Sequence, residues 1–467
     1  MSEQSSSLKF YLILFIFFLG CLTLFINSNN KTAYGLQPYG IAALAEHGKF
    51  YIDTPAFPNV KDYQSYTWDA FPYKDHVYLA KPPAQFIFAA IPYLLLNKLG
   101  INYRNNNDII YGLVSLLTSG LMTSLMTVLI FKITFKITRK IKYSLLISFL
   151  STFGTLLLPY SGIVHHDIFG TFFLIAAFYF LFFKAQVNKK LNGFAVPLSG
   201  FSAGFSAFCS YNTPPIVLVL VLYIILKKNL KDIIIFAISL CMGFSVTLLF
   251  NYFIFDDFFN FPYAIFLKHA NILNQLSLES YLPTIPERIK AYIFSPITGI
   301  LYYSPIYILS YIGIFLLPQK YSIEKLILSL PLPILFITPI ALTPGSAYGW
   351  CQYGSRYLIE TIPFTMIGLS SFYINKKNHV IENLKKNWFL YEVIIVTGII
   401  SIVVCSVGSL GTIYCGFTQN AFLSYLPRII SGDLPKYFFI PSGIILILLS
   451  ILLFKYEYPL KFKKIFP

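Results

Sequence analysis

The residues best suited to chemistry in this 467-residue chain lie in a few short polar segments. Asp53 and Asp69 belong to a polar stretch over residues 27–107, and Lys81 follows in the same stretch, directly before two prolines. A carboxylate there could act as a general base toward an attacking hydroxyl, and a lysine could hold a phosphate as a point charge. Solvated loop acids, and a lysine whose stem lies along apolar surface, remain the alternatives at this point.

Two more segments carry ionisable groups between apolar runs. His165, His166 and Asp167 stand in a row, and Arg356 lies in a stretch rich in aromatic residues and glycine. Asp167 could simply cap a helix, whereas Arg356 could bind a phosphate with two parallel hydrogen bonds. No metal site is predicted at the histidines, because adjacent residues rarely both ligate one ion; a divalent metal is kept as the alternative.

The elements that position these residues follow from the composition, which is 56% apolar and only 12% charged. Soluble proteins carry about 25% charged residues. Continuous apolar runs of about 20 residues predict membrane-spanning helices, since lipid leaves no partner for unpaired backbone groups. We expect an all-α polytopic membrane protein with about twelve transmembrane helices. The expected spans are 10–26, 109–131, 143–162, 168–183, 194–211, 214–226, 233–252, 297–317, 326–342, 359–374, 389–409 and 437–454.

The expected topology places both termini in the cytoplasm. Most of the 35 lysines and arginines then lie in short cytoplasmic loops, as membrane topology demands. The net charge of +16 is therefore no sign of nucleic-acid binding. Residues 1–467 form one domain whose outer loops cover 27–107, 255–295 and 343–358. Amphipathic helices are expected in the first of these loops, which therefore combines interfacial helices with candidate catalytic residues.

Four segments, taken in order, resemble the GT-C superfamily of membrane glycosyltransferases, which includes protein O-mannosyltransferases and lipid A aminoarabinose transferases. The segments are Glu46–Asp53, Asp75–Pro83 with its Tyr-x-x-Lys-Pro-Pro pattern, Ser295–Pro305, and Trp350–Pro363 with its Arg-Tyr-Leu pattern. The last two are similar to those of one uncharacterised bacterial branch. Each motif is weak alone, but all four fall on the expected outer face, and the resemblance covers most of the chain.

The resemblance implies transfer of a sugar from a polyprenyl-phosphate donor to an envelope lipid, glycan or protein, with inversion. Many relatives carry an acid directly after the first helix, and residues 27–31 here contain none. Asp69 is therefore the first choice for the base, Asp53 the second, and Asp167 corresponds to the family's second aspartate. Lys81 and Arg356 are expected to bind the donor phosphate. The candidate substrate-binding residues are His165, His166, Tyr78, Trp350 and Tyr353.

Two other functions are weighed against this one. A transporter of twelve spans would place ionisable residues at a central site within its spans, whereas the spans expected here are nearly free of charge. An O-antigen ligase or polymerase also uses lipid-linked sugars, but such proteins carry their large outer loop in the second half of the chain. The largest loop here follows the first helix. The sequence therefore favours a glycosyltransferase of the plasma membrane whose partners are the lipid-linked donor, an envelope acceptor and membrane lipid.

Overall fold

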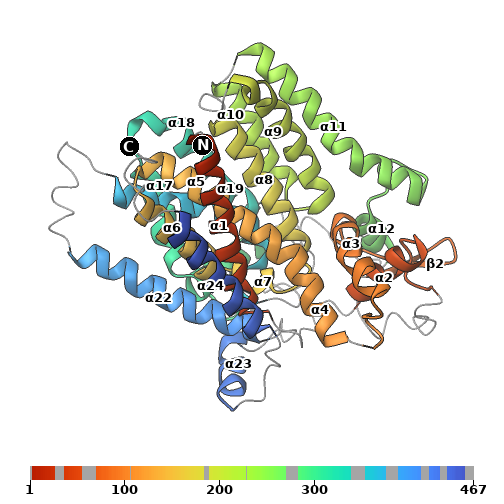
Figure 1. Ribbon diagram of the computed structural model, residues 1–467. Coiled ribbons are helices and arrows are strands. Elements are labelled where there is room, and N and C mark those ends of the chain that lie inside the picture. Colours follow the sequence, from red (N-terminus) through yellow and green to blue (C-terminus); the bar gives the residue numbers. More distant parts are fainter. Residues whose placement is uncertain are drawn as a thin grey trace.

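The computed structural model describes residues 3–26, 36–54, 70–105, 107–183, 189–227, 229–269, 282–337, 353–374, 388–411, 420–431 and 439–457. Helices dominate this part of the chain (Figure 1). The first half forms α1 (Glu3–Thr23), α2 (Gln37–His47), β1 (Ala70–Tyr73), β2 (His76–Leu79), α3 (Ala84–Lys98), α4 (Asn107–Ser115), the π-helical turn η2 (Leu116–Gly120), α5 (Leu121–Thr138), α6 (Ile141–Phe153), α7 (Leu157–Ser161), α8 (His166–Phe183), α9 (Lys189–Cys209), α10 (Pro214–Lys227), α11 (Leu230–Phe255) and α12 (Pro262–His269).

The second half is more broken. It forms η3 (Leu282–Thr284), α15 (Ile285–Phe294), α16 (Ile300–Tyr303), α17 (Ile306–Phe315), η4 (Gln319–Tyr321), α18 (Ser322–Ser329), α19 (Pro331–Leu335), η6 (Arg356–Thr361), α20 (Ile362–Met366), η7 (Ile367–Tyr373), α22 (Trp388–Leu410), α23 (Ala421–Ile430) and α24 (Ile440–Glu457). Prolines at the starts of α17, α19 and α20 explain several of the breaks, because proline lacks the N–H that a continuing helix needs.

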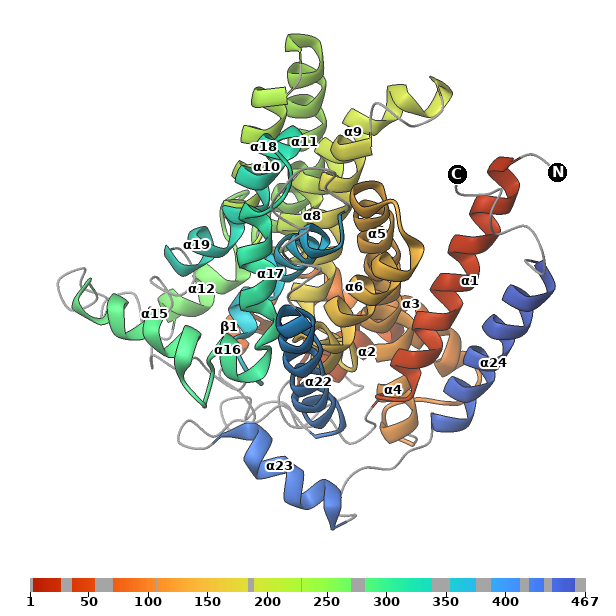
Figure 2. The same cartoon turned by 90° about the vertical axis from the view of Figure 1, so that its left-hand side faces the viewer.

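Helices α1 and α24 pack side by side in opposite directions (Figure 2). Gly20 lies directly against Leu446, and the rings of Phe10 and Phe454 are 6.3 Å apart. The beginning of α1 and the end of α24 therefore lie at the same end of the molecule. This arrangement agrees with termini on one side of a membrane, without identifying which side.

Helices α8, α9 and α11 pack side by side in the upper part of the molecule as drawn in Figure 1, with α9 between the other two. Glycines allow the backbones of α9 and α11 to touch. A Cβ on Gly204 would lie 2.1 Å from the Leu240 carbonyl oxygen, and one on Gly243 would lie 2.3 Å from that of Phe201. Small residues at helix contacts are typical of membrane bundles, in which close packing replaces the hydrophobic effect as the driving force.

The first polar loop contributes helices α2 and α3, as the sequence predicted, together with a two-stranded hairpin that it did not predict. Strands β1 and β2 pair in antiparallel register, with Ala70 opposite Leu79. Lys74 and Asp75 both have positive φ values, which the tight hairpin turn requires. The Tyr73 hydroxyl donates to the Phe255 carbonyl, which ties the hairpin to the end of α11.

The apolar helices agree with an all-helical membrane protein. Among the described residues, four helices are long and apolar enough to cross a bilayer: 109–138, 166–183, 230–255 and 389–410. A fifth candidate is the pair 306–315 and 319–335, which is bent by 101°. Six other apolar helices have only 10–17 residues. The expected count of about twelve spans is thus not established, because several expected spans are shorter or interrupted.

Candidate active site

Asp167 lies in the first turn of α8, where a negative charge is favoured by the helix dipole. The His165 backbone N–H donates to Ser119 Oγ at 3.0 Å, which ties the start of α8 to η2. The Asp167 backbone N–H donates to His165 Nδ1 at 3.2 Å. Since Nδ1 accepts this hydrogen bond, the His165 ring is neutral and carries its proton on Nε2. His165 and Asp167 are both fully buried.

Both predicted phosphate-binding cations act on the charge state of His165. Burial lowers the pKa of the His165 imidazole, which lies just before the candidate span, well below its usual range. Charge interactions with His166, Arg356 and Lys81 lower this pKa further, in decreasing order. Lys81 and Arg356 come from segments far apart in the sequence, yet both influence this one imidazole.

Lys81 is positioned by the packing of α3 on α8. Pro83 forms the N-cap of α3, and one turn into that helix Phe88 stacks on Phe169 with ring centroids 5.3 Å apart. Because Phe169 is two residues after Asp167, this contact holds the start of α3 beside the start of α8. Gln85 is fully buried and donates to the Pro82 carbonyl at 3.2 Å, which stabilises the Lys-Pro-Pro turn.

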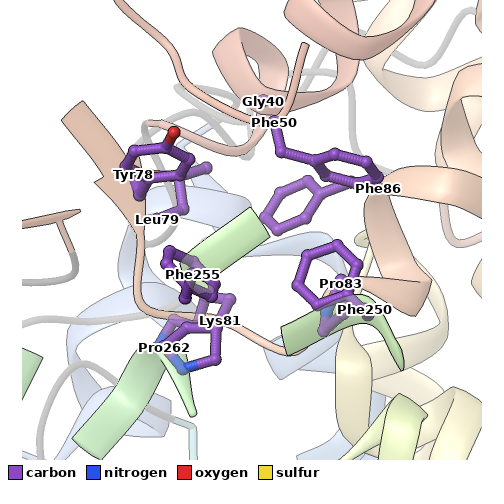
Figure 3. Close-up of a pocket in the computed structure, with 10 residues that line it drawn as sticks. All are labelled: Gly40, Phe50, Tyr78, Leu79, Lys81, Pro83, Phe86, Phe250, Phe255 and Pro262. Carbon is purple, nitrogen blue, oxygen red and sulfur yellow. The ribbon is translucent and has the colours of Figure 1, made fainter. Parts of the chain in front are cut away.

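Lys81 also lines a small pocket of about 20 Å³ (Figure 3). It is the one charged residue among the ten that line this pocket. The other nine are Gly40, Phe50, Tyr78, Leu79, Pro83, Phe86, Phe250, Phe255 and Pro262. Aromatic and aliphatic walls with a single cation suit an amphiphile that has an apolar chain and an anionic head.

Arg356 is held by a network around the segment that precedes η6. The Tyr160 hydroxyl accepts from the Tyr353 backbone N–H at 2.9 Å, and the Ser355 hydroxyl binds the carbonyls of Tyr292 and Thr298. The segments Ser295–Pro305 and Trp350–Pro363, singled out in the sequence, therefore meet through Ser355. These contacts anchor the chain on both sides of the turn that leads to Arg356.

The Arg356 guanidinium itself is almost buried, with 6% of the residue exposed. It stacks on the Tyr357 ring at 4.8 Å and donates to the Tyr357 hydroxyl at 3.0 Å through Nη2. A planar, buried guanidinium supported in this way is suited to binding a carboxylate or phosphate.

Ser210 joins two buried carboxyl groups. Its hydroxyl lies 2.9 Å from Asp167 Oδ1 and 3.0 Å from Glu360 Oε1. Gly170, one turn after Asp167, makes this approach feasible, since a Cβ there would lie 2.7 Å from Ser210 Cβ. Both carboxyls are fully buried, so two negative charges at Asp167 and at Glu360 in η6 would repel each other strongly.

A metal ion is a poor fit for the two histidines as they stand. His166 Nε2 lies 3.2 Å from Asp167 Oδ1, and His165 Nδ1 lies 3.6 Å from Asp167 Oδ2, so distance alone would allow a shared ion. The two imidazole rings, however, are within 17° of parallel with centroids 4.5 Å apart. Their ring lone pairs then lie in separate planes, and His165 Nδ1 already accepts a hydrogen bond.

Asp53 makes contacts that stabilise the hairpin. Its Oδ1 accepts from the Val77 backbone N–H at 2.9 Å, and its Oδ2 lies 3.0 Å from His76 Nδ1. His76 in turn stacks on Tyr51 at 3.7 Å. These contacts account for Asp53 structurally, and a catalytic role for it stays a prediction. Tyr78, by contrast, lines the pocket beside Lys81.

Two predicted site residues, Asp69 and Trp350, lie outside the described residues. Tyr353 is described and is fully buried, with its hydroxyl donating to the Val404 carbonyl at 2.6 Å. That bond anchors η6 on α22, and a contact of Tyr353 with substrate stays a prediction.

Sequence reasoning did not assign roles to Ser210 and Glu360. A signal was present for Glu360, because an acid between apolar residues and four positions after Arg356 is costly unless it has a function. Ser210 has no such signal, since buried serines are frequent in this chain. No protein-family model matches the chain, and neither a curated protein nor a solved structure shows significant similarity to it.

Proposed function

We propose that this protein is a membrane glycosyltransferase that moves a sugar from a polyprenyl-phosphate donor to an envelope lipid, glycan or protein. In this proposal the chain has about twelve spans in the plasma membrane, with both termini in the cytoplasm and the site on the outer face. The sugar is transferred with inversion at its anomeric carbon.

The observation that carries the proposal is that Lys81 and Arg356, from two separate segments, both act on the charge state of His165, two residues before Asp167. Lys81 also lines an apolar pocket. A polyprenyl-phosphate sugar has an apolar chain, then a phosphate, then a polar sugar. These parts match an apolar pocket, a cation and a buried polar group, in that order. Solvated loop residues of unrelated function have no reason to lie close to one another. A transferase, by contrast, needs its phosphate-binding cations close to the group that accepts the proton.

The reaction needs little acid catalysis. The acceptor hydroxyl forms a bond to the anomeric carbon as the bond to the phosphate oxygen breaks, and the phosphate leaves with the electron pair. Fixed cations stabilise the negative charge that develops on it, which is the role of Lys81 and Arg356. A carboxylate takes the proton of the acceptor hydroxyl; Asp69, Asp53 and Asp167 are the candidates.

Mass spectrometry of envelope glycans from cells with and without the gene tests the function directly. We expect loss of one sugar from a lipid, glycan or protein when the gene is deleted, and its return when the gene is restored. Identical glycan profiles in the two strains would contradict the proposal.

The topology is tested at the two ends of α11, a candidate span. Single cysteines can replace Leu230, which is 71% exposed, and Asp256, whose side chain is 64% exposed. A membrane-impermeant thiol reagent should label position 256 in intact cells and position 230 only after the membrane is opened. The opposite pattern would move the candidate site to the cytoplasmic face.

A further inference from the structure

The contacts of Ser210 determine how many protons the two neighbouring carboxyl groups hold. A serine hydroxyl has one proton to donate and two lone pairs to accept with. Its oxygen lies within 3.0 Å of an oxygen on both Asp167 and Glu360, and it accepts from the Asn212 backbone N–H at 3.3 Å. If both carboxyls were ionised, the single Ser210 proton could lie in only one of these two short oxygen–oxygen contacts, and the other would have no hydrogen between its oxygens. One carboxyl must therefore be protonated and donate to Ser210.

The surroundings decide which carboxyl holds the proton. Asp167 lies at the start of α8 and has His166 Nε2 3.2 Å from its Oδ1, so its negative charge is stabilised. Glu360 instead faces the Asp167 carboxyl, which repels a negative charge, and its Oε1 lies 3.0 Å from the Ser210 hydroxyl. Both residues are fully buried, and two adjacent buried carboxylates repel each other strongly. The proton therefore belongs on Glu360.

We propose that Glu360, Ser210 and Asp167 form a directed hydrogen-bond chain in which protonated Glu360 donates to Ser210 and Ser210 donates to ionised Asp167. Glu360 and Ser210 are then positioning residues, which fix the charge and orientation of the Asp167 carboxylate. The titratable groups in contact with Asp167 are His165 and His166, which directly precede it. The charges of Lys81 and Arg356 act on His165.

The chain gives Asp167 a definite task, and this step rests on the proposed function. Its Oδ1 is engaged by Ser210, while its Oδ2 has no hydrogen bond within the described residues. The proton of the acceptor hydroxyl passes to Oδ2 as the acceptor oxygen bonds to the sugar and the phosphate departs. Glu360 keeps its own proton throughout.

Infrared absorption of the purified full chain in lipid nanodiscs at neutral pH tests the protonation pattern without any sugar substrate. A protonated carboxyl absorbs in the carboxylic acid C=O region, apart from ionised carboxylates. We expect this band in the wild type and in Asp167→Asn, and its loss in Glu360→Gln. Absence of the band from the wild type would contradict the proposed hydrogen-bond chain. So would loss of the band in Asp167→Asn together with its retention in Glu360→Gln.

Activity variants test the positioning role. Glu360→Ala removes the donor to Ser210 and should reduce glycan modification roughly tenfold or more. Glu360→Gln offers an amide N–H in place of the carboxyl O–H and should rescue most of that loss. If the glutamine variant is as inactive as the alanine variant while both remain folded, Glu360 must itself ionise and the proposal is wrong. If the infrared pattern is as expected but gene deletion leaves envelope glycans unchanged, the proposed function fails and the hydrogen-bond chain stands.

Discussion

Helix α10 has a charged cluster near each of its ends, and the two clusters are built differently. At one end, Lys227 pairs with Glu324, and the Tyr223 hydroxyl donates to Glu324 Oε1 at 3.1 Å. At the other end, Ser210 precedes α10, and its hydroxyl contacts the carboxyls of Asp167 and Glu360. Fourteen helical residues separate them, or about 20 Å.

The difference between the clusters indicates which one does chemistry. In the Lys227 cluster one cation meets one carboxylate, and the two helices involved, α10 and α18, are held together by it. At the Asp167 end, two carboxyls share Ser210, two histidines adjoin Asp167, and the charges of Lys81 and Arg356 act on His165. A closed pair stabilises the fold, whereas several titratable groups that influence one another suggest a ligand.

The largest difference between the two clusters is expected when one cation is removed from each of them. Arg356→Ala should reduce glycan modification by about 100-fold or more, because the departing phosphate loses a fixed charge. Lys227→Ala should instead lower the free energy of unfolding by about 1–3 kcal/mol, since Glu324 is left buried without its partner. Complementation of a deletion strain and thermal unfolding of the purified variants measure the two effects. Equal loss of activity in both variants would contradict the distinction between a cluster that acts in the reaction and one that stabilises the fold.

Lys81→Ala sharpens the assignment of the pocket. Polyprenyl phosphate should raise the thermal unfolding temperature of the wild type in nanodiscs, because a ligand that binds only the folded state stabilises it. Polyprenol, which lacks the phosphate, should have a smaller effect. The difference between the two lipids should vanish in Lys81→Ala; a difference equal to that of the wild type would exclude Lys81 from phosphate binding.

Gly170→Ala tests whether the close approach of Ser210 matters. A methyl group there would meet Ser210 Cβ at 2.7 Å and Thr213 Cγ2 at 2.8 Å, so Ser210 must move away from Asp167. We expect a loss of about 1–3 kcal/mol in stability together with reduced activity. Gly193→Ala is the matched control, since a Cβ on this helical glycine meets nothing within 4 Å. If both variants behave alike, the packing at Gly170 has no role in the site.

The helical membrane character could be predicted from the sequence because apolar runs directly encode it. The apolar pattern also predicted α2 and α3. A shared role of Lys81 and Arg356 in phosphate binding stays a prediction. Interruptions of the expected spans were harder to foresee. The expected span 297–317, for example, is divided into α16 and α17 at Ser304 and Pro305.

The hairpin and the hydrogen-bond chain were missed for different reasons. The turn at Lys74 and Asp75 lacks the glycine or asparagine that usually marks such a turn. The chain depends on long-range contacts, since Ser210 and Glu360 are 150 residues apart and only the packing at Gly170 brings Ser210 to Asp167. A single sequence carries no local pattern for such contacts.

The most direct test of the account compares one nearly isosteric substitution in each cluster, Asp167→Asn and Glu324→Gln. Each is expressed in a strain that lacks the gene, and envelope glycans are analysed by mass spectrometry alongside the protein level in the membrane. The account predicts that the wild type and Glu324→Gln restore the missing sugar and that Asp167→Asn, at equal protein level, does not. Restoration by Asp167→Asn, or failure of both variants while the protein remains in the membrane, would contradict it.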